Sequence, residues 1–393
     1  MNLIRERKSS IIYSLLLVFL LIPFFKPDIV TSFQKINYIY IVVMGISFLC
    51  VLCIYIKNMK INKFDILCLM FYAILAISTF KNKGNILKLV SDFILNFGIV
   101  VFVNIYKKGN KVQFLKVISI FYYVLLILNT VSFLIFPEGI AQTEYLKTPI
   151  YLIGIDNRFA FTYIPGLCII AIYDILVNKK LTKYTYIFFI ATYATFIYFW
   201  SAGALIAESL FLVFYIVIYK LKIKNLIGKY FPTVIISFVL LVICRLQRLF
   251  KYLIVDILHK DLTLSSRTLL WDSAIKIIKE NKLIGIGVQK SKRMIELISA
   301  YHSHSHFLNV ILQSGFLGIS VYFGMIFSVF AKLKKYKENI IAQIIAFTLF
   351  VIFIMLLVDT FDITCNLMLL MAPSIFFLSI FKSKIIAIKL FKK

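Results

Sequence analysis

Long apolar stretches separated by short polar segments follow one another along almost the whole chain. About 20 apolar residues in a helix cross a bilayer core, and stretches of roughly that length recur. They cover approximately residues 11–25, 36–56, 64–80, 89–106, 112–136, 159–177, 184–200, 202–219, 230–246, 305–330, 340–358 and 363–381. The pattern predicts an all-α polytopic membrane protein with about 12 transmembrane helices, with residues 1–393 as a single integral membrane domain.

The composition agrees with this class. Hydrophobic residues make up 62% of the chain and the mean hydropathy is +0.95, whereas soluble domains are about 45–50% apolar. The chain therefore has more apolar surface than a soluble fold of this length would bury.

The positive charge lies between the apolar stretches, mostly in every second connection. The formal net charge is +27, and lysine and arginine in short loops keep those loops on the cytoplasmic side. The basic connections contain Lys57, Lys60 and Lys63; Lys107, Lys108 and Lys111; Lys179, Lys180 and Lys183; Lys220, Lys222, Lys224 and Lys229; Lys332, Lys334, Lys335 and Lys337; and the tail from Lys382 to Lys393. This distribution predicts that both termini are cytoplasmic, with Lys81, Lys83 and Lys88 as mild exceptions. It explains the charge without nucleic acid as a partner.

Two predicted extracytoplasmic segments are too long for simple turns: a second outer loop at about 137–158 and a large one at about 247–304. Between Arg245 and His304 there are 11 basic residues against 5 acidic ones. Such an excess suits an anionic ligand at the headgroup level, and the planar arginine guanidinium matches phosphate oxygens. Ordinary loop charge explains the same excess equally well.

The stretch SSRTLLWDSAIKIIKEN in the large loop predicts an amphipathic helix. Its apolar residues recur at three- and four-residue spacing, namely Leu270, Trp271, Ala274, Ile275, Ile277 and Ile278. Such a helix would lie on the membrane surface with Trp271 at headgroup level, or would pack on the helix bundle. The two interpretations are compatible.

Three of the four histidines, His302, His304 and His306, alternate with serine just before the tenth predicted helix. If the segment is extended, the alternation places the three rings on one side, where they could bind zinc; no Asp, Glu or Cys stands beside them to complete the ligands. A neutral imidazole could instead act as a general base. The third interpretation is that the histidines are loop residues without a chemical role. From these residues alone it is as well supported as the general base.

The sequence SSRTLLWDSAIKIIKENKLIGIGV, followed by HSHFLNVILQSGFLGI, resembles the superfamily of O-antigen ligases and O-antigen (capsular or exopolysaccharide) polymerases. The shared features are an arginine with a tryptophan after it, a Gly-x-Gly turn, a His-Asn-x-Phe-Leu motif and a helix start that contains glycine. They correspond to Arg267, Trp271, Gly285, Gly287, His304 to Leu308, Gly315 and Gly318, with Ser305 in place of the asparagine. GIDNRFAF, residues 154–161, is similar to another family segment. A Ser-Arg-x-Ala motif is present only as Ser201 to Ala204, without its arginine.

The resemblance implies a metal-independent glycosyltransferase that needs no cofactor. Its substrate would be a polyprenyl-diphosphate-linked oligosaccharide at the extracytoplasmic face of the bacterial inner membrane, and its partners the lipid bilayer and the flippase and chain-length regulator of the same pathway.

The resemblance also implies roles for particular residues. Arg267, with Arg158 and one or both of Arg245 and Arg248, is expected to bind the diphosphate, and His304 to take the proton of the acceptor hydroxyl. Asn157 is expected in substrate binding, His306 in orienting the acceptor or capping the helix, and Trp271 in stacking on a sugar or, preferably, lying in lipid.

Three functions remain open at the level of the sequence. A polymerase adds the glycan to another lipid-linked repeat unit, and a ligase transfers it to a different acceptor such as a lipid A core. The richness in Lys, Ile, Phe and Asn is typical of AT-rich genomes, including many Gram-positive bacteria without lipid A, and favours the polymerase. A flippase or transporter would use ionisable residues within spans, for which Asp65, Asp92, Asp174 and Glu208 are the candidates, with Glu208 either on a pathway or in packing.

Overall fold

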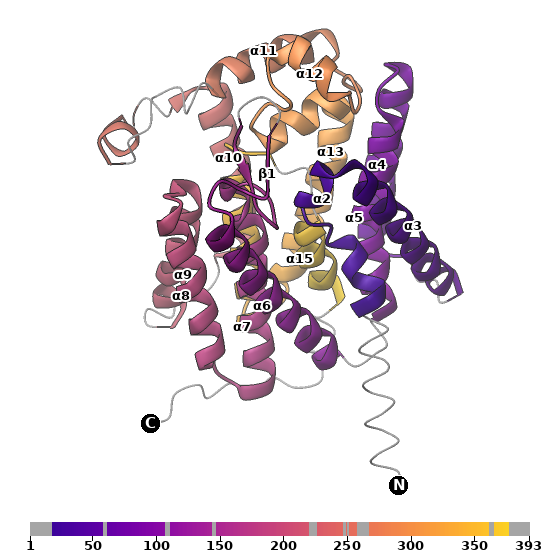
Figure 1. Cartoon of the computed structure of the whole chain (residues 1–393). Coiled ribbons are helices and arrows are strands. Elements are labelled where there is room, and N and C mark those ends of the chain that lie inside the picture. Colours follow the sequence, from indigo (N-terminus) through magenta and orange to yellow (C-terminus); the bar gives the residue numbers. More distant parts are fainter. Residues whose placement is uncertain are drawn as a thin grey trace.

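The chain is all-α, with one two-stranded sheet in the residues that the structure describes (Figure 1). This computed structural model describes residues 18–57, 61–106, 111–143, 147–219, 226–246, 249, 251–257, 267–360 and 365–376. Helices lie over eleven of the twelve predicted ranges within this part of the chain. Most of the first predicted range, 11–25, falls outside the described residues.

The main helices are α3 (Gln34–Lys57), α4 (Lys63–Lys81), α5 (Ile86–Tyr106), α6 (Lys111–Ile135), α7 (Ala160–Asn178), α8 (Lys183–Tyr198), α9 (Ala202–Tyr219), α10 (Ile227–Phe238), which continues as the π-helical η3 (Val239–Ile243), α13 (His306–Lys334), α14 (Ile340–Met355) and α15 (Cys365–Phe376). Shorter elements are η1 (Ile22–Phe24), α2 (Ile29–Ser32), β1 (Ala141–Gln142), β2 (Pro149–Ile150), η2 (Asp156–Arg158), η5 (Tyr252–Ile257), α11 (Arg267–Glu280) and α12 (Ser291–Ile298).

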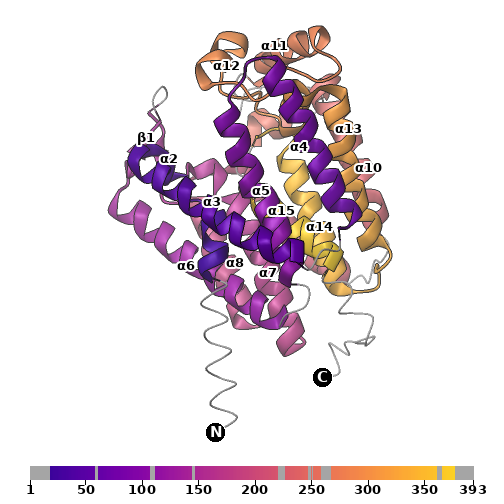
Figure 2. The same ribbon diagram turned by 90° about the vertical axis from the view of Figure 1, so that its right-hand side faces the viewer.

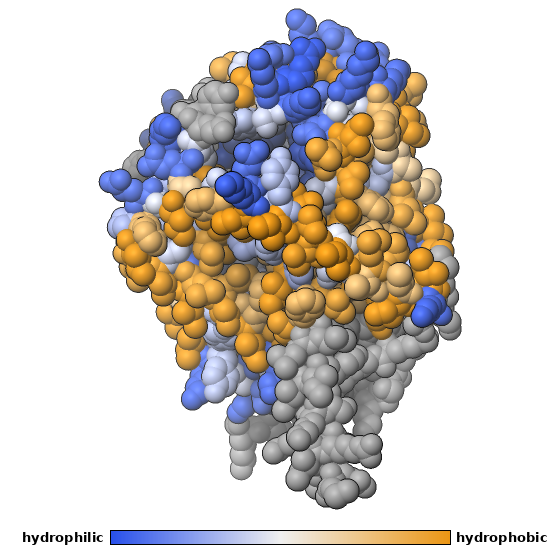
Figure 3. Space-filling model, turned by 45° about the vertical axis from the view of Figure 1, so that its right-hand side comes forward, coloured by the Kyte–Doolittle hydropathy of each residue, from blue (hydrophilic) through white to orange (hydrophobic). Residues whose placement is uncertain are grey.

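Six helices in the described residues, α3 to α7 and α13, are long and apolar enough to cross a membrane. Figure 3 shows the corresponding surface, on which hydrophobic residues form a broad belt below a hydrophilic end. Such a belt suits the hydrocarbon core of a bilayer, because apolar side chains that face lipid need no hydrogen-bond partner. The structure therefore confirms the class of multi-pass membrane protein.

The two ends of the bundle differ in their elements. Helices α11 and α12 cover one end, as Figures 1 and 2 both show, and the turn between α7 and α8, with Lys179 and Lys180, lies at the opposite end in Figure 1. Helix α13 starts beneath α11 and α12 and ends in the basic segment that contains Lys332 and Lys334.

Helix α13 is interrupted at Gly315, which adopts φ +64° and ψ −166°. The turn between α11 and α12 inserts at this break: the N–H groups of Ile286 and Gly287 donate to the carbonyls of Leu312 and Gln313, at 2.9 and 2.8 Å. On the other side of the break, the N–H of Phe316 and of Leu317 donate to Lys282 and Leu283 at 2.8 and 3.1 Å. The broken helix thus joins the large outer loop to the bundle.

Glycine is required at this junction because two backbones approach closely. A Cβ on Gly315 would lie 2.3 Å from the carbonyl of Leu283, and one on Gly285 would lie 2.5 Å from the carbonyl of Leu312. Both residues have positive φ, which side chains disfavour. The Gly-x-Gly turn, which contains Gly285, and the helix-start glycine Gly315 therefore pack against each other at the same contact.

Helix α11 packs on the bundle, against α13, rather than lying free on the membrane. Its Trp271 is fully buried, with 0% of its surface exposed. The expectation that Trp271 lies in lipid at headgroup level is therefore wrong. A sugar cannot stack on a ring with no exposed face in this conformation, so Trp271 contributes packing to the fold.

Candidate functional site

The histidine segment bends where an extended strand was expected. His304 has a left-handed backbone conformation with φ +50°, and its N–H donates to Nδ1 of His302 at 3.3 Å. The rings of His302 and His304 are in contact, with centroids 4.2 Å apart and their planes tilted by 60°. His302 is buried and holds the bend, whereas His304 is half-buried.

His306 is the first residue of α13, and its ring is buried in the bundle. Its Nε2 atom forms a hydrogen bond with the hydroxyl of Tyr322, 2.9 Å away, and its N–H is shared between the carbonyls of Leu356 and Asp359, each at 2.9 Å. The N-cap of α13 is Ser305, and the His306 ring bonds to Tyr322 instead of capping the helix. Acceptor binding by so buried a ring has no support.

The metal interpretation of the histidines gains no geometric support. Across the residues that the structure describes, no three side chains of His, Cys, Asp or Glu are grouped to hold a metal ion.

Arg267 lies at the start of α11, close to His304. Its Nη1 atom donates to the carbonyl of Val358, in the connection between α14 and α15. The next residue in that connection, Asp359, has its Oδ1 atom 4.0 Å from Nδ1 of His304. Three segments far apart in the sequence therefore meet in one place.

The electrostatics of His304 show which charges surround it. Burial lowers the pKa of this imidazole to about 4, and the charges of Arg267 and Arg158 act in the same direction. The carboxylate of Asp359 opposes them. Because an ordinary histidine has a pKa near 6.5, His304 is neutral at pH 7 and can accept a proton.

Arg158 reaches the site from η2, in the second outer loop. Its Nη1 lies 3.3 Å from Oδ2 of Asp28, and both side chains are mostly buried. Gly154 permits this approach: a Cβ there would lie 2.5 Å from the same Asp28 oxygen, and Gly154 has φ +126°. A segment near the N-terminus thus holds one of the two arginines that act on His304.

Arg245 packs against α11 and contacts other partners than His304. Its Nη2 donates to Oδ1 of Asp272 at 2.6 Å and to the carbonyl of Thr268 at 3.3 Å, and its guanidinium stacks on Trp271, 4.8 Å from the ring centroid. A cation–π contact of this kind is worth about 0.5–2 kcal/mol. Arg245 therefore fastens α11 in this conformation.

Two further predicted site residues remain predictions. Arg248 lies outside the described residues. Asn157 is exposed in η2, and its N–H donates to Oδ1 of Asp156 at 2.8 Å. No contact of Asn157 with the His304 group supports its expected part in substrate binding.

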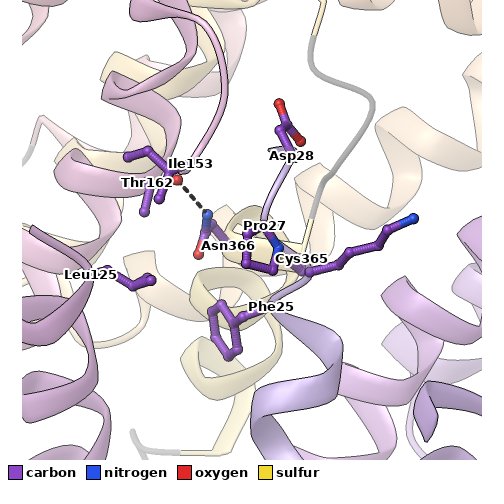
Figure 4. A pocket seen from close by; sticks show the side chains of 9 residues that line it. Phe25, Pro27, Asp28, Leu125, Ile153, Thr162, Cys365 and Asn366 are labelled. Carbon is purple, nitrogen blue, oxygen red and sulfur yellow. Dashed lines mark hydrogen bonds between the residues drawn. The ribbon is translucent and has the colours of Figure 1, made fainter. Parts of the chain in front are cut away.

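A small pocket lies on the other side of Asp28, between the N-terminal segment, α6, α7 and α15 (Figure 4). Its lining residues are Phe25, Lys26, Pro27, Asp28, Leu125, Ile153, Thr162, Cys365 and Asn366. The Asn366 amide donates to the Thr162 hydroxyl at 3.3 Å, the bond drawn in Figure 4, and accepts from Tyr122 at 2.7 Å. The side chain of Asn366 thus has its hydrogen-bond partners within the protein.

Sequence reasoning did not find Asp359 and Asp28. Both are single acidic residues in short connections, and neither belongs to a recognisable motif. The only available signal was an acidic residue at the predicted outer end of a span. The connection at 359–362 contains two aspartates, Asp359 and Asp362, and the sequence gives no reason to prefer one of them.

The fold and this group of residues define a multi-pass α-helical membrane protein with a histidine just before the start of α13, on whose imidazole the charges of two arginines act. Residues 186–323 of the chain match the family described as O-Antigen ligase. This stretch contains Arg267, the Gly-x-Gly turn and all three clustered histidines, so the resemblance to the O-antigen ligase and polymerase superfamily is confirmed. The match supports a function of the ligase or polymerase type in general. A comparison with curated proteins finds no match.

Proposed function

We propose that this protein is a surface polysaccharide polymerase. It transfers a glycan from a polyprenyl diphosphate to a sugar hydroxyl of another lipid-linked repeat unit, without a metal ion. The observation that carries the proposal is that the charges of Arg267 and Arg158 both act on the imidazole of His304, while Arg267 contacts Val358, the residue before Asp359, at one end of an apolar helical bundle.

The two arginines provide the binding site for the donor's diphosphate. Arg267 and Arg158 come from different outer segments, and their charges act on the same imidazole. Guanidinium groups pair with phosphate oxygens through charge-assisted hydrogen bonds. When the bond between the anomeric carbon and the diphosphate oxygen breaks, these cations stabilise the negative charge of the leaving polyprenyl diphosphate.

His304 supplies the base. It is neutral at pH 7 because burial and the two arginines lower its pKa. As the acceptor oxygen attacks the anomeric carbon, the hydroxyl proton passes to the imidazole, and the attack from the face opposite the diphosphate inverts the anomeric configuration. General-base assistance of this kind contributes typically 10²–10⁴-fold to a rate.

The proposal places the site at the extracytoplasmic face and both termini in the cytoplasm. Its support is the basic connection between α7 and α8, which lies at the opposite end of the bundle from α11 and α12. Lysine-rich short loops are retained on the cytoplasmic side.

A ligase is the second candidate, favoured by the description of the matching family. The same donor site would serve both, and only the acceptor differs. A flippase is less supported, because Glu208, its strongest intramembrane candidate, accepts a 2.6 Å hydrogen bond from Thr192 and joins α8 to α9.

The test is to delete the gene in its own host and separate the lipid-linked glycans on a gel. A polymerase predicts loss of the ladder while single repeat units remain. Long lipid-linked chains left untransferred would indicate a ligase instead. Repeat units that fail to reach the outer leaflet would indicate a flippase and contradict the proposal.

A further inference from the structure

We propose that Asp359 is a positioning residue for His304, holding its imidazole with Nδ1 toward the carboxylate and Nε2 toward the acceptor hydroxyl. This inference rests on the proposed function, in which His304 takes the acceptor's proton. The geometry that suggests it is the 4.0 Å separation between Nδ1 of His304 and Oδ1 of Asp359.

The backbone around Asp359 is held from two sides. Arg267 of α11 donates to the carbonyl of Val358, and the N–H of His306 in α13 is shared between the carbonyls of Leu356 and Asp359. The Oδ1 atom of Asp359 also accepts the N–H of Thr360 at 2.8 Å. The carboxylate therefore has a fixed place beside His304, set by the same arginine that is proposed to bind the diphosphate.

The histidine has an unused atom that faces this carboxylate. Nδ1 of His304 is buried and has no hydrogen-bond partner among the described residues. A buried polar atom without a partner costs about 1–3 kcal/mol, so a bond to Asp359 would be favourable. The present 4.0 Å is too long for one, but such contacts often shorten only when substrate fills the site.

The Asp359 carboxylate has a second role, because of the charges around His304. Arg267 from α11 and Arg158 from η2 both disfavour an imidazolium, and the tilted ring of His302 lies beside it. Among the described residues whose charges act on His304, Asp359 is the one that favours the protonated form. Taking a proton between two arginines therefore depends on Asp359 to stabilise the product.

The variant Asp359→Asn tests the negative charge of Asp359 separately from its contribution to the local structure. An asparagine keeps an Oδ1 acceptor for the N–H of Thr360 and leaves the backbone carbonyls in place, but removes the negative charge. Asp359→Glu restores the charge at a shifted position. Glu296→Gln is the matched control, because Glu296 lies on α12 in the same outer loop and forms only an exposed ion pair with Arg293.

The first readout is nitrogen NMR of the full-length protein in lipid nanodiscs, labelled at its four histidines. Wild type should carry the His304 proton on Nδ1 at pH 7 and be partly protonated at pH 4. Asp359→Asn should leave His304 wholly neutral at pH 4, and Asp359→Ala should also lose the preference for the Nδ1 proton. Glu296→Gln should match wild type.

The second readout is turnover of lipid-linked repeat units extracted from the deletion strain. Asp359→Asn should lower kcat by about 10²-fold, within the range of general-base effects, with little change in KM, and Asp359→Glu should recover part of the loss. A loss of activity without any change in the His304 titration would mean that Asp359 is only structural, and would overturn the inference.

The inference and the proposed function fail in different ways. If His304→Ala retains full turnover, the proposed base is wrong. If His304→Ala is inactive while Asp359→Asn has the wild-type rate and titration, only the role of Asp359 is refuted.

Discussion

Arg267 and His304 approach neighbouring residues of one short segment: Arg267 donates to the carbonyl of Val358, and Nδ1 of His304 lies 4.0 Å from the carboxylate of the next residue, Asp359. The segment connects α14 to α15, so the meeting depends on the fold of the whole C-terminal half. It also places a permanent cation near an imidazole, which keeps that imidazole neutral. The proposed transfer from a lipid diphosphate uses this arrangement, with the imidazole as the base and the guanidinium as the cation that binds phosphate.

Replacing His304 by asparagine should remove most of the activity without unfolding the protein. The side chain is half-buried, and its Nδ1 has no hydrogen-bond partner among the described residues, so little stability depends on the ring. We expect a fall of about 10²–10⁴-fold in the rate of polymer formation and an unchanged Tm in nanodiscs. His302→Ala is the comparison, because it removes the acceptor for the His304 N–H and should lower Tm. Wild-type polymer yield in His304→Asn would rule out the base.

Replacing Arg158 by glutamine should weaken binding of the donor. The change keeps a donor group near Asp28 but removes the charge that acts on His304. Hydrogen bonds to charged groups contribute about 1.5–3 kcal/mol, so we expect KM for the lipid-linked donor to rise about 10- to 100-fold. Arg293→Gln on α12 is the control, because its ion pair is exposed. Equal KM values for Arg158→Gln and the control would exclude Arg158 from the donor site.

Inorganic pyrophosphate should raise the pKa of His304. The charges of Arg267 and Arg158 help to lower this pKa to about 4, and an anion bound to both arginines neutralises that effect. The titration midpoint of His304 in histidine-labelled protein should therefore move to higher pH when pyrophosphate is added. Arg267→Gln should raise the midpoint without the ligand. A midpoint that does not respond to pyrophosphate would mean that the arginines do not bind it beside His304.

Replacing Gly315 by alanine should destabilise the outer loop. The residue has φ +64°, and a Cβ would lie 2.3 Å from the carbonyl of Leu283. A strained backbone of this kind costs about 1–3 kcal/mol, and the clash adds to it, so both Tm and activity should fall. Gly45→Ala is the matched control, because a Cβ there meets nothing within 4 Å. If the two variants unfold at the same temperature, the contact between the turn and α13 is not needed for stability.

The sequence predicted the helices well because lipid imposes a strong pattern. Apolar stretches of the right length can only be helices in a bilayer, and the observed α3 to α10 and α13 to α15 lie over the predicted ranges. The break in α13 was not predicted. Gly315 was noted as a motif residue, but its role depends on the turn at Gly285, 30 residues away, and only the fold brings the two together.

The candidate site was predicted in part. The charges of Arg267 and Arg158, which the family resemblance had indicated, act on the imidazole of His304, and the roles of these three residues stay predictions. The fold places Arg245 on Trp271 and Asp272 instead, because an arginine near an aromatic ring and a carboxylate has strong local partners. Asp359 could not be predicted, since a single aspartate in a short connection carries no pattern.

The most direct test of the central proposal is the structure of the full-length protein in nanodiscs with polyprenyl diphosphate bound, determined by electron cryo-microscopy. The account predicts that the diphosphate contacts the guanidinium groups of both Arg267 and Arg158, and that His304 lies beside it. A diphosphate bound at the opposite end of the bundle, or one that contacts neither arginine, would contradict it.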